Sequence, residues 1–396
     1  MYILKQIPED FIVEEISKNN YSQKENKYLI CKLTKNNLSQ LLAIKIIASA
    51  LNIPLKDIGI AGTKDKHAIT YQNISIKTSG KTNQTKEKVE KIVLPNKNNE
   101  KRNLSLEVLG FASIPLSLGD HNGNRFTITI RNLSNPNNSV VLKLGLNHNI
   151  KEINSSSKDF IFLNYFDEQR FQKNNSQIGF ALIKKDWKQA ANLLKTNKEV
   201  ESTLKQYPNQ PLKAIKTLTK RELMMYLHAY QSFIFNKTVS RFINQTTNKT
   251  SQKIQKYSLG ELNFTSQEEL IKLNFANSKG LEIKSFKKNQ DSLIQVPLPG
   301  FLKHKSKNQL INQIQEQILK EENVKHSDFI IKQLSNLSQE GDLRDIIKIA
   351  KDLIIKKPET DDLNQDNQKK KVTISFSLNK GSYATMFIKQ LIIEKK

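Results

Sequence analysis

Residues 58–72 read IGIAGTKDKHAITYQ and place a short charged turn between two apolar, β-branched runs. Runs of this kind are typical of strands, so the sequence predicts two strands joined by a turn over 62–67. Gly62 gives this turn backbone freedom. The alternation of the second strand, 68–76, slips near its middle, and a bulge near 72–73 would explain the slip.

The turn carries one acidic side chain, Asp65, between Lys64 and Lys66. An aspartate in a turn most often bonds backbone amides. Here the two lysines surround the carboxylate with positive charge, which favours its ionised form. An ionised carboxylate beside a basic surface can act as a nucleophile or base on a polyanionic substrate. Asp65 is therefore a candidate catalytic residue.

Strands and helices are predicted at both ends of the chain. Alternating apolar residues predict strands over 10–16, 28–33, 126–131 and 372–378. Ser39 is a predicted N-cap, followed by a helix with an apolar stripe of Leu42, Ile46 and Ala50. A last helix is predicted over 383–393, and the polar stretch 78–103 is predicted as a loop.

The middle of the chain has a different pattern. It is helical in period over 176–245 and 304–355, and Thr219-x-x-Glu222 is a capping box ahead of a long helix. A strand-rich stretch over 257–296 separates the two helical regions. Strand-rich ends around a helix-rich centre predict an α+β protein in which one domain is inserted into another.

The chain of 396 residues has 63 basic and 38 acidic residues and a net charge of +25. An excess this large attracts a polyanion, most plausibly nucleic acid. Most of the basic residues are lysines in a chain rich in Asn and Ile, so a compositional bias with solvated lysines is the alternative. No basic run or aromatic RNA-binding motif decides between the two.

Several classes of protein are disfavoured by composition. No apolar run approaches the length that spans a bilayer, and the N-terminus lacks the order of a signal peptide. Cys31 is the only cysteine, so no intrachain disulfide can form, and a cytoplasmic location is expected. The sequence has no metal-ligand spacing and no GxGxxG or GxxxxGK[ST], so neither a metal nor a nucleotide cofactor is expected.

Seven segments in order along the chain resemble the TruD-type pseudouridine synthases. They are PEDF at 8–11, AGTKDKHA at 61–68, GNRF at 123–126, NYFDEQRF at 164–171, QSFIFN at 231–236, PLPG at 297–300 and KGSYAT at 380–385. The resemblance implies an enzyme that isomerises uridine to pseudouridine within RNA. It also implies that Asp65 is the catalytic residue, which attacks the sugar or the base or deprotonates the sugar.

The same resemblance implies the residues that hold the extruded uridine. Aromatic rings at Phe11, Phe126 and Tyr383 would surround it, Asn124 would recognise uracil, and Lys5 would contact phosphate. Stacking recovers about 1–3 kcal/mol per base, and extrusion costs a few kcal/mol. We therefore expect Phe126 to be open to solvent before RNA binds. From the sequence alone, Phe11 and Phe126 could also be ordinary core residues.

The resemblance further implies a pseudouridine-synthase catalytic domain with a mixed β-sheet and flanking helices. This domain would combine 1–165 with 346–396, and the insertion, 166–345, would be a helix-rich TRUD domain. Asp167 and Gln172 stand where the family has glycine. If those glycines require a positive φ, the backbone here must differ or be strained. Asp167 would also place a negative charge near the RNA.

The expected substrate is tRNA, usually uridine 13 of the D-arm, although other structured RNAs are alternatives. No obligate protein partner is predicted. A catalytically inactive tRNA-binding protein of the same fold would keep the charge and dispense with Asp65. A base-flipping RNA methyltransferase would need an S-adenosylmethionine site, for which the sequence has no Gly-rich strand-turn-helix.

Overall fold

The computed structural model describes residues 2–18, 20–78, 82–92, 103–133, 158–249, 252–257, 260–265, 269–270, 273, 294–364 and 369–392. The chain forms two compact units. Unit 1 comprises Met1–Phe160, Ile349–Ala384 and Leu391–Lys396, and unit 2 comprises Ile161–Lys348 and Thr385–Gln390. Each described helix is too short or too polar to cross a membrane.

Unit 1 is built on one sheet, whose strands include β1 (Phe11–Ser17), β2 (Tyr28–Asn36), β3 (Ile58–Ile60), β4 (Ile69–Lys77), β5 (Asn103–Ala112), β6 (His121–Leu133), β12 (Ile347–Ile355), β13 (Glu359–Thr360) and β14 (Lys370–Asn379). Their order is β5-β2-β4-β1-β6-β14-β12, with β3 on β4 and β13 on β14. The pair β1–β4 is parallel, whereas β1–β6, β6–β14 and β2–β4 are antiparallel. This is the mixed sheet that the family resemblance implies.

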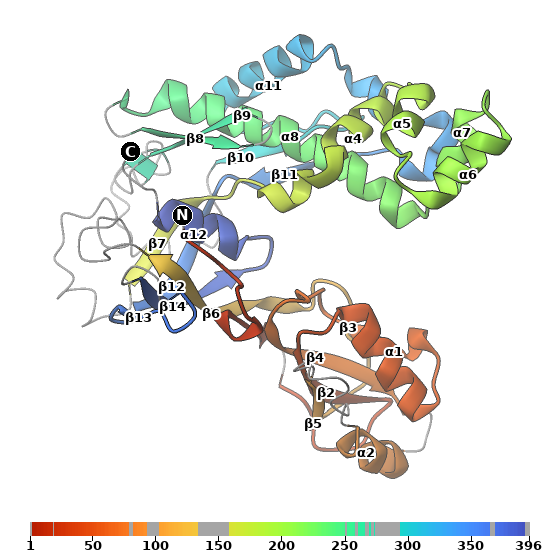
Figure 1. Cartoon of the computed structure of the whole chain (residues 1–396), viewed down its shortest axis with the longest axis vertical. Helices are drawn as coiled ribbons and strands as arrows, with labels where there is room; N and C mark the ends of the chain where they lie inside the picture. Colours follow the sequence, from red (N-terminus) through yellow and green to blue (C-terminus); the bar gives the residue numbers. More distant parts are fainter. Residues whose placement is uncertain are drawn as a thin grey trace. The chain divides into compact units, whose positions relative to one another are not determined.

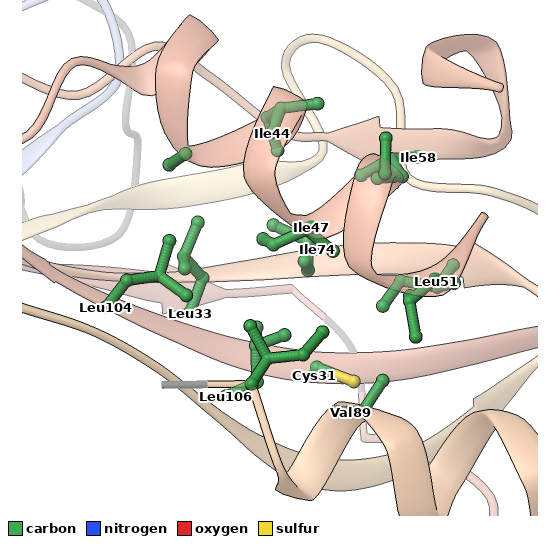
Figure 2. Packing of buried hydrophobic residues seen from close by; sticks show 14 of the residues in the cluster. Cys31, Leu33, Ile44, Ile47, Leu51, Ile58, Ile74, Val89, Leu104 and Leu106 are labelled. Carbon is green, nitrogen blue, oxygen red and sulfur yellow. The ribbon is translucent and has the colours of Figure 1, made fainter. Parts of the chain in front are cut away.

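Two helices, α1 (Gln40–Leu51) and α2 (Thr82–Glu90), form a core with strands β2, β4 and β5. Figure 2 shows their apolar side chains gathered against those of the strands. The predicted cap is confirmed, because the Ser39 hydroxyl accepts a hydrogen bond from the Leu42 amide. The predicted stripe is wrong: Leu42 is 42% exposed, and α1 instead buries Ala43, Ile44, Ile47, Ala48 and Leu51. Apolar residues lie on most sides of α1, so their spacing could not select the buried face.

The polar stretch 78–103, predicted as a loop, contains α2. This helix is mostly polar, and its buried Val89 packs in the core. One apolar contact in nine residues is too weak a periodic signal to predict a helix. Residues 79–81 and 93–102 of the stretch lie outside the described residues.

Strand β4 has no bulge at the predicted position, because it pairs with β2 residue for residue from Ile69 to Lys77. The slip in its alternation has another cause. Thr70 and Gln72 lie on the same face as the buried Ile74 and Ile76, and all four are buried. The inward face of β4 is therefore polar in its first half, which a search for apolar alternation cannot follow.

Unit 2 is mainly helical, with α4 (Asn175–Ile183), α5 (Trp187–Leu193), α6 (Lys198–Gln206), α7 (Pro211–Ile215), α8 (Lys220–Thr246) and α11 (Gln309–Glu321). The long helix α8 packs against α4 and α11 (Figure 1). Thr219 and Glu222 form the predicted capping box at its start. Unit 2 also has the hairpin β8 (Lys253–Tyr257) and β9 (Gly260–Phe264), and the pair β10 (Gln295–Leu298) and β11 (Asp342–Asp345).

The helical period predicted over 304–355 is only partly correct. Helix α11 lies there, but residues 342–355 form the strands β11 and β12. Buried Ile346, just before β12, and buried Ile347 and Ala350 within it have the spacing of a helix, and β12 carries a register shift after Lys351. The predicted domain boundaries at 165/166 and 345/346 stay a prediction, as does the strand content of 266–293, most of which lies outside the described residues.

Candidate active site

The charged turn 61–68 joins β3 to β4 and is bonded to three neighbouring segments. The Lys35 ammonium group donates a hydrogen bond to the Asp65 carbonyl oxygen. The side-chain amide of Gln72 donates a hydrogen bond to the Gly62 carbonyl at 3.4 Å. The main-chain amide of Gly119 donates one to the Ala61 carbonyl at 2.8 Å. Gly62 does not have a positive φ, so the expected backbone freedom is not used. The turn is fixed by its contacts instead.

Asp65 presents its carboxylate to Lys5. The Lys5 ammonium lies 3.0 Å from Asp65 Oδ2, and the Asp65 side chain is 47% exposed. The same ammonium lies 3.9 Å from the centroid of the Phe11 ring. Lys5 has a φ of 58°, an uncommon backbone conformation for a non-glycine residue that is frequent at functional sites. The carboxylate is thus oriented by a cation yet open to a ligand.

Lys64, which the sequence places beside Asp65, points elsewhere. Its ammonium lies 2.6 Å from Glu15 Oε2, and both side chains are buried. The other Glu15 oxygen accepts a hydrogen bond from the Asn73 amide at 3.2 Å. The expectation that Lys64 surrounds Asp65 with positive charge is therefore wrong, because Lys64 neutralises Glu15 and attaches the turn to β1.

Lys35 is a residue that the sequence reading missed. It is fully buried on β2, in the inward phase of Cys31 and Leu33, both also fully buried. Burial lowers the pKa of Lys35 to about 8; the Asp65 charge opposes this shift and the Lys64 charge adds to it. A lysine in the inward phase of a strand was the signal that could have identified it.

The strand register places two other predicted site residues, Asn124 and Phe126, on one face of the sheet. Glu15 pairs with Asn124, and Val13 pairs with Phe126. Phe126 and Asn124 also pair with Phe376 and Leu378 of β14. Asn124 therefore lies beside the buried Glu15, which holds the turn through Lys64. The structure brings Asn124 and Phe126 to the part of the sheet that the turn contacts.

Some buried polar atoms on this face have no hydrogen-bond partner among the described residues. They are Asn124 Oδ1, Thr70 Oγ1 and Gln72 Oε1. Buried polar groups are nearly always paired, and an unpaired one is costly. These three atoms lie close to the turn that carries Asp65, and each can accept a hydrogen bond from water or from a ligand with hydrogen-bond donors.

The predicted aromatic residues differ in exposure. Phe11 is 2% and Phe126 is 8% exposed. Their ring centroids are 6.1 Å apart, edge to face, and Phe126 stacks on Phe376 at 5.4 Å. The expectation that Phe126 is open to solvent is therefore wrong, since its ring packs between two others. Tyr383 is half-buried and directly precedes α12 (Ala384–Leu391).

The turn before Tyr383 is linked to the charged turn through the loop 113–120. The Lys380 ammonium donates to the Gly119 carbonyl at 3.3 Å, and the Gly119 amide donates to Ala61. Gly381 has a φ of 77°, so the turn that the sequence predicts after β14 requires its glycine. The segments that carry Asp65 and Tyr383 are therefore connected within unit 1.

Asp167, in unit 2, stands at a position where the family has glycine, and its backbone shows no need for one. Its φ is −84°, and Gln172 is also outside the positive-φ region, so neither position needs glycine here. The buried Asp167 carboxylate lies 2.6 Å from the Lys389 ammonium and accepts a hydrogen bond from the Thr385 hydroxyl. The negative charge expected near the RNA is thus paired within unit 2.

The described residues contain no group of three or more His, Cys, Asp or Glu side chains that could hold a metal ion. The chemistry available at the turn is that of one exposed carboxylate with a cation beside it. A carboxylate of this kind can act as a nucleophile or as a base.

Comparison with known proteins identifies relatives along the whole chain. The family model described as tRNA pseudouridine synthase D (TruD) matches residues 2–203 and 191–391. "Probable tRNA pseudouridine synthase D 2" of Methanocaldococcus jannaschii is 30% identical, over 99% of this chain and 92% of its own. "Probable tRNA pseudouridine synthase D" of Nanoarchaeum equitans is 31% identical, over 99% of this chain and 98% of its own.

A solved structure has the same mixed α+β fold. The TruD crystal structure from Methanosarcina mazei aligns with a TM-score of 0.64 and 25% sequence identity. The alignment covers 98% of this chain and 93% of the other.

Proposed function

We propose a substrate and a catalytic residue for this chain, which belongs to the tRNA pseudouridine synthase D (TruD) family and is a pseudouridine synthase, an isomerase. The names of its relatives imply a tRNA substrate. We propose that it converts uridine 13 in the D-arm of tRNA to pseudouridine and that Asp65 is its catalytic residue. The observation that supports this most is the pairing of an exposed Asp65 carboxylate with Lys5 at 3.0 Å.

The reaction is an isomerisation with a simple balance. The bond from the ribose C1′ to N1 of uracil breaks, and a bond from C1′ to C5 forms. C5 loses a proton and N1 gains one, so no oxidant, reductant or cofactor is consumed. Asp65 would attack the sugar, attack the base or deprotonate the sugar, and all three begin with a carboxylate within reach of the nucleotide.

The proposed binding residues divide into two groups. The first group would contact the extruded uridine and consists of Phe11, Asn124, Phe126 and Tyr383. The second is Lys5, which would contact the phosphate of the nucleotide or hold the Asp65 carboxylate in position. Because Phe11 and Phe126 are buried in the free protein, we propose that they form the floor of the uracil site and expose an edge of their rings to it. Asn124 Oδ1, which has no hydrogen-bond partner in the described part of the chain, would accept a hydrogen bond from uracil.

We also propose the wider organisation that the family implies. Residues 1–165 and 346–396 would form the catalytic domain, and 166–345 the inserted TRUD domain. The enzyme would act in the cytoplasm without a metal, a cofactor or an obligate protein partner.

The test is an assay on unmodified tRNA with no added cofactor. Pseudouridine is mapped by nucleotide position after incubation with the wild-type chain, with Asp65→Asn and with Asp65→Ala. We expect modification at position 13 by the wild-type chain alone. The variants should bind tRNA almost normally, because binding is spread over many phosphate contacts.

Three outcomes would contradict parts of the proposal. Modification at another position would refute the choice of uridine 13. Turnover by either Asp65 variant would refute the catalytic role of Asp65. Binding of tRNA without any turnover by the wild-type chain would favour the inactive binding protein.

A further inference from the structure

We infer that Lys35 is a positioning residue for Asp65: its ammonium group, buried beneath the turn, fixes the main chain that carries the catalytic carboxylate. The inference rests on the proposed function, because that function gives Asp65 its role. It adds Lys35, a residue of strand β2, to the residues of the proposed site.

The geometry holds Asp65 at two points. Lys35 donates a hydrogen bond to the main-chain carbonyl of Asp65 from the inner side of the turn. Lys5 meets the carboxylate of the same residue at 3.0 Å on the accessible side. With its main chain bonded to one lysine and its side chain to another, Asp65 has little freedom to move its carboxylate away from the nucleotide.

Stability alone does not explain a lysine at this position. Lys35 is 0% exposed, and its neighbours in the inward phase of β2, Cys31 and Leu33, are apolar core residues. A buried ammonium group is expensive to desolvate, and an apolar side chain of similar length often serves stability as well or better. Residues that break the pattern of their element in this way are expected at functional sites.

The charged groups around Lys35 are known. The charges of Asp65 and Lys64, both in the turn, affect the pKa of Lys35. Asp65 is itself paired with Lys5, and Lys64 is paired with Glu15. Burial favours the neutral form of Lys35 and the Asp65 charge favours the protonated form, with a pKa of about 8 as the result. A neutral amine is a weaker hydrogen-bond donor than an ammonium group, so the bond to the Asp65 carbonyl, and with it the positioning, should weaken as Lys35 loses its charge.

The experiment compares Lys35→Met with Lys32→Met. Lys32 is on the same strand but faces the opposite side of the sheet, where it lies 3.6 Å from Glu14. Single-turnover pseudouridine formation, tRNA affinity and thermal unfolding are measured for both. Lys35→Met should lower the rate by up to about 100-fold, the effect of a small misplacement of a catalytic group. Its tRNA affinity and melting temperature should not fall, and Lys32→Met should behave like the wild-type chain.

A pH profile separates positioning from a merely structural role. The wild-type rate should fall as the pH rises through about 8, where Lys35 loses its proton. Lys35→Met should lack this fall. Lys35→Arg, which keeps its charge at every pH used, should recover part of the rate and also lack the fall. This variant carries the test if Lys35→Met does not fold.

A wild-type rate in Lys35→Met overturns the inference. So does a rate loss that is matched by a lower melting temperature while the pH profile stays unchanged. A wild-type chain that is inactive on tRNA overturns the proposed function and this inference together. An active wild-type chain whose Asp65→Asn variant is inactive and whose Lys35→Met variant is fully active overturns the inference alone.

Discussion

Replacing Glu15 by glutamine should lower the free energy of unfolding of unit 1 by about 3–5 kcal/mol, because it leaves the Lys64 ammonium buried without its partner. The magnitude follows from the geometry. The two charged atoms are 2.6 Å apart, and the side chains are 5% and 2% exposed. Solvent therefore cannot replace the lost carboxylate, and the neutral amide compensates only part of the charge.

The chain offers a matched control one residue away. Glu14 pairs with Lys32 at 3.6 Å, but its side chain is 50% exposed. An exposed pair contributes about 0–1 kcal/mol, so Glu14→Gln should change the unfolding free energy little. The double variant Glu15→Leu/Lys64→Met should recover most of the loss, because both charges leave the interior together.

The assay must report on unit 1. Trp187, the only tryptophan of the chain, belongs to unit 2, so its fluorescence would follow the wrong unit. Hydrogen exchange of β1 and β4 amides in increasing urea reports the opening of the sheet around Glu15. A loss below about 1 kcal/mol for Glu15→Gln, or a loss as large for Glu14→Gln, would refute the view that the buried pair attaches the turn.

Three further outcomes are expected. Phe126→Ala should cost about 3–5 kcal/mol of folding stability, because its buried ring stacks on Phe376 at 5.4 Å; a much smaller loss in a urea melt would show that the ring is not core-packed. The logarithm of tRNA affinity should fall against the logarithm of salt concentration with a slope steeper than about −1, and a shallower slope would support compositional lysine bias. Burial alone would raise the pKa of Asp361, but hydrogen bonds from the Asn132 amide and from Arg131 lower it to about 2. Its folded pKa is below the ordinary aspartate pKa of 3.8, so its stabilising effect is present above pH 3.8 and is lost as the pH falls towards 2; an acid melt of Asp361→Asn should lack this dependence.

Much of the sheet could be predicted from alternation. Strands β1, β2, β6 and β14 were predicted within a few residues of their ends, apart from the start of β6, because each has one apolar face and one more polar face over most of its length. Alternation failed over 342–355, where an irregular strand has an apolar spacing like that of a helix. It also failed in β4, whose inward face is polar at Thr70 and Gln72.

The sequence singled out one residue of the candidate site but not its contacts. The order of seven short segments selects Asp65, whose catalytic role stays a prediction, and no property of the turn itself distinguishes it from an ordinary turn aspartate. The partners of the turn, Lys35, Glu15 and Lys5, come from separate segments whose approach depends on the register of paired strands and on one positive φ. Sequence patterns describe one element at a time, so such contacts between elements are not visible in them.

The residues around the turn that the sequence did not predict have a common physical feature. Lys35, Glu15, Thr70 and Gln72 are polar residues in the inward phase of three neighbouring strands, and their polar side chains are buried. Each costs stability relative to an apolar residue at the same position. Three of them bond the turn that carries Asp65, directly or through Lys64. A turn of eight residues cannot hold a carboxylate in place by its own packing, so the sheet beneath it must supply polar contacts, and the strands lose their regular pattern where they do so.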